Sequence, residues 1–384
     1  MTPVDSPATH NFAVLRQEQF PVAERYVYLN HAALGPLPRR AADAVAAVAG
    51  DFRDRGMLAE RTWLPAVTRT RALLARLLHV APGEIAFTKN TSQGLGIVAA
   101  SVPWKPGDVI VTVRGEFPAN VYPWLALQQA GVQVRFVQPR QGRIMLADLN
   151  HALDGAKMLA ISWVQYSNGF RVDLGALSEL CHRRGVLLCL DAIQGAGALP
   201  LDLQDTPVDF CAFGGHKWML APQGIGVLYV NPRVRDLLRP ANVGWMGVAW
   251  QNYTAFDYDT PLLEGAPRYE EGTRSLLGIA GLEQSLGLLL EVGPANIAAR
   301  LATLTEHLAQ RLLARGYQLS TPLLPVERSG ILTFFHGQRS AHELWDRLRA
   351  ARIVAAVREG GVRLSPHLYN TVDEMDAVVD ALEG

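Results

Sequence analysis

The sequence predicts an α/β protein with a doubly wound, mostly parallel sheet in a large domain and a smaller α+β domain at the C-terminus. Helical and strand-like patterns alternate from about residue 40 onward, as in repeated βαβ units. Two of the strand-like segments, residues 158–164 and 186–190, are almost continuously apolar. Such runs are typical of parallel strands that are covered on both faces. The length of 384 residues also favours two domains over one.

The large domain is expected over residues 25–265, after an N-terminal arm over residues 1–24 that shows little periodicity. The expected helices cover residues 69–78, about 95–102 and 174–184, the last ending at Gly185, a common helix terminator. The expected strands cover residues 85–88, 109–113, 132–137, 158–164, 186–190, 210–213 and 225–230.

The small domain is expected over residues 266–384, after a stretch rich in aromatic and turn residues at 253–265. Its helices and strands follow in a looser order than the βαβ units, which indicates an α+β arrangement. The expected helices cover 278–290, 296–314, 341–350 and a segment from about 373, and the strands cover 331–335, 353–357 and 362–365.

The composition argues against several classes of protein. Hydrophobic residues make up 49% and charged residues 19%, and 36 basic side chains balance 36 acidic ones. A general binder of nucleic acid or anionic membranes is normally basic, so we expect neither partner. No apolar run approaches the roughly 18 residues of a spanning helix, and the N-terminus lacks the features of a secretory signal. Three cysteines cannot form a disulfide framework, which favours the cytoplasm.

Two charged residues follow buried strands, where open α/β sheets bind ligands. Asp191 ends the apolar strand at 186–190, and burial of a carboxylate without a cationic partner is costly. A protonated pyridine nitrogen is one such partner. Lys217 follows another strand and two glycines, and a lysine facing a ligand crevice is a candidate to form a Schiff base. The alternative is an ordinary salt bridge between Asp191 and Lys217 at the rim of the sheet.

Two further segments could bind anions. The segment 89–94, which contains Thr91 and Ser92, lies between a strand and a buried helix, so free N–H groups and hydroxyls could hold an anion there. The alternative is a plain helix cap. Arg363 could clamp a substrate carboxylate bidentately, and the alternative is a surface or interdomain ion pair.

Together these elements resemble the class V aminotransferase family of pyridoxal phosphate (PLP) enzymes of fold type I. That family includes cysteine desulfurases, selenocysteine lyases, kynureninases and isopenicillin N epimerase-like proteins. The resemblance runs from about Tyr26 to the C-terminus. Its motifs, in chain order, are Tyr28-Leu-Asn30-His31-Ala-Ala-Leu-Gly35, Asn90-Thr-Ser92, Asp191-Ala-Ile-Gln194, His216-Lys217, Glu271-Gly-Thr273 and Tyr369-Asn-Thr371.

The resemblance implies a role for each cofactor-binding residue. Lys217 would hold PLP covalently and then move the α-proton, and Asp191 would keep the pyridine nitrogen protonated. Gln194 would donate to the phenolic oxygen. Phe117 would stack on the ring, where the family usually has a histidine that can also do acid–base work. The phosphate would contact Thr91, Ser92, His216 and, from the other subunit of a homodimer, Thr273.

The substrate would be an amino acid, bound through Arg363, Asn30, His31 and Tyr166. His31 or Tyr166 could serve as the second base of an epimerase. The loop 165–168 should end near the cofactor oxygen and the substrate carboxylate, but the sequence does not indicate which of its four residues makes the contact. Trp245, Trp250 and Tyr253 stand where the family lines its site near the dimer interface, or else they pack in the core. No His/Cys cluster has metal-ligand spacing, so we expect no metal.

One departure from the family pattern reduces the number of reactions that we expect. Persulfide-forming desulfurases carry a catalytic cysteine in a loop before the carboxylate-binding arginine, whereas here only four residues, 359–362, separate Arg358 from Arg363. Cys181, Cys189 and Cys211 are expected to be small buried hydrophobes. The expected activity is therefore C–S β-lyase-like or epimerase-like. Transamination and a non-catalytic regulatory protein with this fold remain as alternatives.

Overall fold

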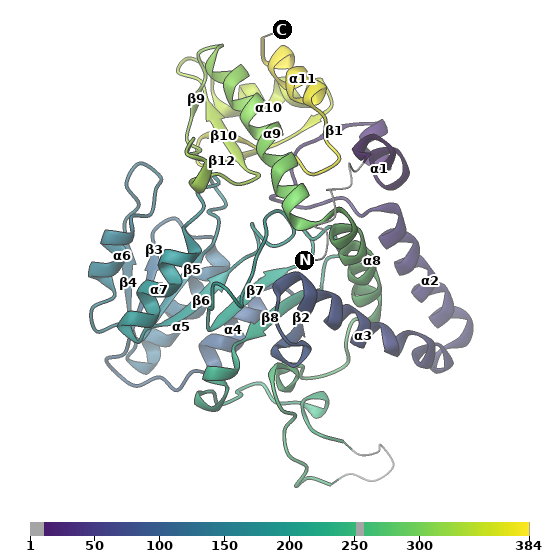
Figure 1. The fold of residues 1–384 in the computed structure, drawn as a ribbon, viewed down its shortest axis with the longest axis vertical. Coiled ribbons are helices and arrows are strands. Elements are labelled where there is room, and N and C mark those ends of the chain that lie inside the picture. The colour runs from purple at the N-terminus through teal and green to yellow at the C-terminus, as the bar shows by residue number, and fades with distance from the viewer. Residues whose placement is uncertain (1–10, 251–256, 384) are drawn as a thin grey trace, which may run out of the picture.

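The computed structural model describes residues 11–250 and 257–383, and its centre is a seven-stranded sheet (Figure 1). The strand order is β2-β8-β7-β6-β5-β3-β4. The five strands from β7 to β4 are parallel, whereas β8 pairs antiparallel with both β7 and β2. The strands are β2 (Ile85–Thr88), β3 (Val109–Val113), β4 (Gln133–Val137), β5 (Met158–Ser162), β6 (Leu187–Asp191), β7 (Phe210–Gly214) and β8 (Gly226–Val230). The expected mostly parallel sheet is confirmed.

Both faces of this sheet are covered because alternate residues of its apolar strands point to opposite sides. On one face lies α4 (Thr91–Ser101), in a core shared with Ala160 and Ala212. On the other face lie α3 (Met57–Leu78), α7 (Leu174–Arg184) and α8 (Leu276–Val292), in a core shared with Ile161 and Phe213. The short helices α5 (Tyr122–Ala126) and α6 (Leu146–Ala152) cover the remaining strands.

The C-terminal part forms a second body around a four-stranded antiparallel sheet of order β12-β13-β10-β9. Figure 1 shows its helices together above the large sheet. A separate core cluster joins these helices to the strands. The elements are α9 (Pro294–Leu313), β9 (Gln318–Leu319), β10 (Leu332–Phe335), α10 (Ala341–Ala350), β11 (Ile353–Val354), β12 (Ala356–Arg358), β13 (Gly361–Leu364) and α11 (Val372–Glu383).

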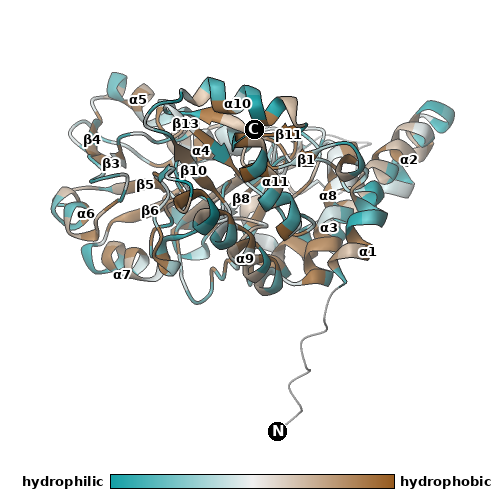
Figure 2. Ribbon diagram, turned by 90° about the horizontal axis from the view of Figure 1, so that it is seen from above, coloured by the Kyte–Doolittle hydropathy of each residue, from teal (hydrophilic) through white to brown (hydrophobic). Residues whose placement is uncertain are grey.

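The N-terminal segment packs on this second body. The arm contains α1 (Phe12–Gln19), and β1 (Val27–Tyr28) pairs parallel with β11. Helix α2 (Arg39–Arg55) follows and lies at one end of the molecule (Figure 2). Helix α8 lies beyond residue 265 but packs against α2 and α3. The domain limits proposed from the sequence stay a prediction.

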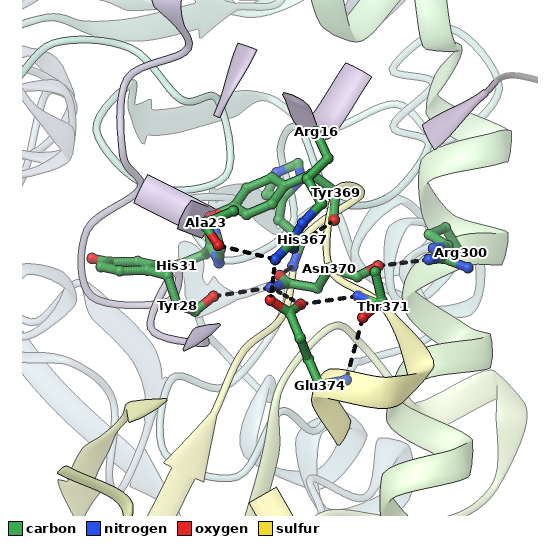
Figure 3. Close-up of polar contacts among 10 residues, drawn as sticks. All are labelled: Arg16, Ala23, Tyr28, His31, Arg300, His367, Tyr369, Asn370, Thr371 and Glu374. Carbon is green, nitrogen blue, oxygen red and sulfur yellow. Dashed lines mark hydrogen bonds and ion pairs between the residues drawn. The ribbon is translucent and has the colours of Figure 1, made fainter. Parts of the chain in front are cut away.

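An ion-pair network fastens the arm to the C-terminal end of the chain (Figure 3). Arg16 donates to the carbonyls of Ala23 and Tyr369, both at 3.2 Å, and pairs with Glu374 at 2.7 Å. Glu374 also accepts hydrogen bonds from the Asn370 amide and the Thr371 N–H. The Tyr369-Asn-Thr371 motif therefore has a structural role at this junction.

Within residues 11–250 and 257–383, no single helix has the length and apolarity to cross a membrane. Helices α8 and α9 meet those criteria only as a pair, which is bent by 77°.

Candidate active site

A cavity of ≈ 230 Å³ lies where β3, β5, β6 and β7 end and α4 begins. The carboxyl ends of parallel strands are where such sheets bind ligands. The residues predicted from the sequence that line this catalytic cavity are Thr91, Ser92, Phe117, Tyr166, Asp191, Gln194, His216, Lys217 and Arg363.

Asp191 is the last residue of β6 and is only 2% exposed. One carboxylate oxygen accepts the Ile193 N–H at 3.0 Å. Burial raises the pKa of Asp191, and the nearby Glu116 acts in the same direction, against the Ile193 N–H and Lys217. No cationic side chain of the described residues lies within ion-pair distance of it, so the expected alternative of a rim salt bridge with Lys217 is not supported. A buried carboxylate of this kind fits a ligand that brings its own N–H cation.

Lys217 follows β7 on a segment that Gly35 holds in place. The Gly35 N–H donates to the His216 carbonyl at 2.8 Å, and a Cβ at Gly35 would lie 2.3 Å from the Lys217 carbonyl oxygen. Only glycine therefore allows this approach. Lys217 is 8% exposed, and burial lowers its pKa, with Arg363 and Arg358 acting in the same direction. The neutral amine that a Schiff base requires is thereby favoured.

The opposite wall of the cavity is aromatic. The Lys217 Nζ lies 5.5 Å from the centroid of the Phe117 ring. Phe117 in turn meets the Tyr166 ring edge-on, with centroids 5.3 Å apart. A phenyl ring can stack on a flat ligand but cannot exchange a proton with it.

The start of α4 is both a helix cap and an anion site. The Asn90 side chain accepts the Gln93 N–H at 2.9 Å, as a plain cap does. The Thr91 hydroxyl, however, is buried and has no hydrogen-bond partner among the described residues. Ser92 and the half-buried His216 also line the cavity. An orphaned hydroxyl at the start of an 11-residue helix fits the phosphate group that the family resemblance implies.

Gln194 is held in one orientation by two hydrogen bonds. Its Oε1 accepts from the Trp218 indole at 2.8 Å, and its Nε2 donates to the Ala32 carbonyl at 3.0 Å. Because the indole can only donate, the amide cannot be flipped. The second Nε2 hydrogen is left for the cavity, as the expected donation to a phenolic oxygen requires.

Arg363 lies on β13 and is 1% exposed. Its Nη1 donates to the Tyr166 carbonyl at 2.7 Å, while its Nε is buried and has no hydrogen-bond partner in the part of the chain that the structure describes. Burial and the nearby Arg358 lower the pKa of Arg363 to about 10. In the described chain it makes no ion pair, so the alternative of a surface or interdomain pair is not supported. A buried guanidinium with a free N–H fits a substrate carboxylate.

Three expected site residues do not line this cavity. His31 is fully buried, and its Nδ1 and Nε2 lie 2.8 Å from the Ser365 carbonyl and 3.0 Å from the Tyr369 hydroxyl. The expected substrate contacts of His31 and Asn30 are therefore not supported, because the chain reaches the cavity through Ala32 and Ala33 instead. Thr273 is exposed and away from the cavity of its own chain.

Two residues of the site were not expected. Glu116 is buried and accepts the Ser162 N–H at 2.8 Å, the Gln165 amide at 3.0 Å and the Ser162 hydroxyl. Its position directly before Phe117 at a strand end was the only sequence signal. Arg358 lines the cavity beside Arg363. In the loop 165–168, Gln165 binds Glu116, and Tyr166 is the residue that reaches the catalytic cavity.

Of the other residues singled out in the sequence, those that the structure describes do not line the catalytic cavity. Trp245 and Trp250 are not among the residues that line the cavity, and Tyr253 lies outside the described residues. All three cysteines are buried, as expected. Burial raises the pKa of Cys181 to about 12, and it also raises the pKa values of Cys189 and Cys211. The described residues contain no group of three or more His, Cys, Asp or Glu that could hold a metal ion.

Comparisons with known proteins agree with this geometry. The family model described as aminotransferase class-V matches residues 27–378. Isopenicillin N epimerase of Streptomyces clavuligerus is 29% identical, over 93% of this chain and 94% of that protein. A probable cysteine desulfurase of Streptomyces coelicolor is 30% identical, over 96% of this chain and 95% of that protein.

Solved structures extend the comparison. A cystine C–S lyase in complex with its reaction product, cysteine persulfide, superposes with a TM-score of 0.88 at 25% identity, over 95% of this chain and 99% of that one. An apo cysteine desulfurase from Thermococcus onnurineus shares the fold, with a TM-score of 0.88 at 24% identity. The chain belongs to the class V aminotransferase family and is a PLP-dependent enzyme of fold type I.

Proposed function

We propose that this enzyme cleaves the Cβ–S bond of a cysteine-derived amino acid by β-elimination. With water, the reaction would yield a thiol, pyruvate and ammonia. The observation that carries this proposal is the asymmetry of the catalytic cavity, in which Lys217 faces the phenyl ring of Phe117. Elimination needs one base and a leaving group, and one lysine suffices for the base.

The residues of the cavity would divide the work as follows. PLP, when bound, supplies the electron sink for a carbanion at Cα. Lys217 would carry the cofactor and then take the Cα proton and deliver a proton to the departing sulfur. Asp191 would hold the pyridine N–H, and Gln194 would hold the phenolic oxygen. Arg363 would fix the substrate carboxylate, and Thr91, Ser92 and His216 would hold the phosphate.

The leaving sulfur would not pass to an enzyme thiol. A persulfide-forming cysteine must be a partly exposed, mobile thiolate, and the three cysteines here are buried with raised pKa values. The link between Arg358 and Arg363 is a tight hairpin, because Arg358 pairs directly with Gly361. It leaves no excursion of chain that could carry a nucleophile into the cavity.

Epimerisation is the weaker candidate. It requires proton exchange on both faces of Cα, and Phe117 cannot supply it. His31 does not line the cavity, and both of its ring nitrogens are engaged. Burial and Glu359 raise the pKa of the Tyr166 phenol, which makes Tyr166 a poor base near neutral pH.

We further propose a cytoplasmic homodimer in which Thr273 of each chain reaches the phosphate end of its partner's cavity. Thr273 is exposed. Two positions earlier, Glu271 pairs with Lys89, just before the start of α4, at 2.9 Å. Sedimentation of the wild type and of Thr273→Ala tests this proposal. A monomer, or PLP affinity unchanged in the variant dimer, would contradict it.

The reaction is tested by incubating the holoenzyme with L-cysteine S-conjugates in D₂O. Pyruvate and ammonia in equal amounts are expected. Inversion at Cα without pyruvate would instead establish epimerisation, and a keto acid that retains the side chain would establish transamination.

The absence of a persulfide is tested with the variant in which Cys181, Cys189 and Cys211 are all changed to Ala. It should keep most of the activity once its folding is confirmed. Mass spectrometry of the wild type after turnover with cysteine should find no added sulfur on the protein. A stoichiometric persulfide on any cysteine would overturn this part of the proposal.

A further inference from the structure

A second cavity of ≈ 520 Å³ adjoins the catalytic cavity, and Arg358 lines both. We call it the distal cavity. Its walls come from the ends of β3 and β5 and from the β12–β13 hairpin, and they include Arg114, Gln165, Asn168, Arg358 and Glu359. Its volume is within the range of small-molecule sites.

The basic side chains of the two cavities lack acidic partners. Arg114, Arg358 and Arg363 make no ion pair with any residue in 11–250 or 257–383. Arg114 lines the distal cavity, and its guanidinium carbon lies 4.1 Å from the centroid of the Phe136 ring, which is not part of the wall of that cavity. The Arg358 Nη1 donates to the Val357 carbonyl at 2.7 Å.

The acid at the distal cavity is already engaged elsewhere. Glu359 accepts a hydrogen bond from the Tyr166 hydroxyl at 3.1 Å. Its backbone has a φ of +46° at the tip of the β12–β13 hairpin, which is uncommon for a residue other than glycine. The turn and the Tyr166 contact thus fix Glu359 at the junction of the two cavities, where it does not pair with either Arg114 or Arg358.

The hairpin places two like charges on one face. Arg363 pairs across the strands with Ala356, and Arg358 lies two residues further along the same strand as Ala356. Residues two apart in a strand share a face, so both guanidiniums point to the same side. Two neighbouring cations repel each other unless an anion lies between or beside them.

We propose that the distal cavity binds an oxyanion at the far end of the substrate, carried by the group that leaves with the sulfur. The α-carboxylate would occupy Arg363, and the second anion would lie between Arg358 and Arg114. The inference rests on the proposed function, and it names the substrate class as cysteine S-conjugates with an acidic terminus.

The test compares three ligands of similar length that differ at the far end. They are S-(2-carboxyethyl)-L-cysteine, S-(2-sulfoethyl)-L-cysteine and the neutral S-propyl-L-cysteine. Binding to the holoenzyme is followed by the change in its visible cofactor absorbance, and pyruvate is measured in parallel. We expect the acidic ligands to bind about tenfold or more tightly than the propyl ligand, as one added charge-assisted contact provides. The ratio between the carboxylate and the sulfonate then identifies the preferred oxyanion.

Two variants assign the preference to the cavity. Arg114→Gln should reduce the preference for acidic ligands to about threefold or less. Arg114→Glu should reverse it, so that a fourth ligand, the basic S-(2-aminoethyl)-L-cysteine, binds this variant more tightly than the acidic ligands do. A purely structural role of Arg114 would not produce this inversion. Arg140→Gln is the matched control, because Arg140 is exposed, pairs with Asp148 and does not line either cavity. It should leave the preference and the activity unchanged.

The outcomes separate the two proposals. Equal binding of the acidic and neutral ligands by the wild type, or a preference that survives in Arg114→Glu, would overturn the distal site. Selective binding without pyruvate would leave the distal site standing and would refute the elimination reaction instead.

Discussion

Asp191 and Glu116 are two buried carboxylates at the ends of β6 and β3, the strands on either side of β5. Among the described residues, Asp191 has no ion-pair partner. Glu116 is satisfied by three donors from Ser162 and Gln165. Asp191 receives a single N–H, from Ile193, at 3.0 Å. The two residues are therefore not equivalent. Glu116 fixes the loop that carries Phe117, and Asp191 keeps an acceptor for the cofactor.

Asp191→Asn should impair catalysis far more than cofactor binding. An amide cannot hold the pyridine nitrogen protonated, so the electron sink weakens, while the phosphate contacts remain. We expect kcat to fall by more than about 100-fold, or about 2.7 kcal/mol, and the affinity for PLP to change by less than about tenfold. Steady-state kinetics and PLP titration measure both. Wild-type Cα proton exchange in the variant would refute the role.

His367 should make the protein sensitive to acid. Its Nε2 lies 3.0 Å from the Trp218 carbonyl, and burial lowers its pKa from 6.5 to about 4. Between those two values the unfolded chain binds a proton that the folded chain does not, so stability falls as the pH drops from about 6.5 to 4. By linkage, His367 alone should lower the free energy of unfolding by up to about 3 kcal/mol over this pH range.

The measurement is Tm between pH 7.5 and 4 for the wild type and for His367→Gln. The variant should be less stable at pH 7.5, because it loses the packing of the buried ring, but its Tm should fall less on acidification. Parallel curves for the two proteins would show that His367 does not carry the effect.

For single residues, the sequence identifies candidate site residues that follow apolar strands. It does not identify residues whose role depends on which strands are adjacent in the sheet. Asp191 stands directly after an apolar run, and Lys217 follows another one after Gly-Gly-His. These placements indicate a ligand site or a salt bridge, and only the ordered set of family motifs favours the ligand site. Glu116 acts through Ser162, a contact that requires β3 and β5 to be adjacent. The motif that contains His31 reaches the cavity through Ala32 and Ala33, whereas the His31 ring contacts Tyr369, and the sequence gives no sign of that contact.

At the scale of elements, the seven strands of the large sheet were predicted to within one or two residues. Six of them are almost fully buried and stand out as mainly apolar runs, whereas β4 is partly exposed. The antiparallel direction of β8 has no such signal. Helix α2 and the first half of α3 were missed because they are largely exposed, and Pro65 interrupts the α3 pattern. The strands β1 and β9 have two residues each, too few for any periodicity.

Two glycines of helix α4, Gly94 and Gly96, allow a test of how closely this helix packs on the sheet. A Cβ at Gly94 would lie 2.9 Å from the Ala212 Cβ on β7, whereas a Cβ at Gly96 would meet no atom of the described residues within 4 Å. Gly94→Ala should therefore destabilise the protein by about 1–3 kcal/mol and weaken PLP binding through Thr91 and Ser92. Gly96→Ala should be neutral or stabilise the helix by up to about 1 kcal/mol.

Thermal unfolding and PLP titration of both variants decide the point. If the two alanines have equal effects, then helix propensity rather than close packing governs α4.

For the whole molecule, the two ends of the chain are joined by the Arg16 network in Figure 3. The Arg16 and Glu374 side chains are 23% and 8% exposed, so the loss of Arg16 leaves a nearly buried carboxylate without its cation. Arg16→Ala should lower the free energy of unfolding by about 1–3 kcal/mol. The control is Arg53→Ala, because Arg53 pairs with Asp54 in full contact with solvent.

The Tm values of both variants test whether the Arg16–Glu374 pair stabilises the folded chain. A clear decrease is expected for Arg16→Ala and little change for Arg53→Ala. Equal Tm values would mean that the arm does not stabilise the folded chain. Because the arm leads through β1 directly to Ala32 and Ala33, lower activity of Arg16→Ala at elevated temperature should accompany the decrease.

The central claim is that Lys217 carries the cofactor, and borohydride reduction tests it most directly. Reduction converts the bond between lysine and PLP to a stable amine, and peptide mapping by mass spectrometry then locates the added mass. We predict that it lies on Lys217 in the wild type and that Lys217→Ala, although folded, carries none. A phosphopyridoxyl group on another lysine of the wild type, or no labelled peptide at all, would contradict the account.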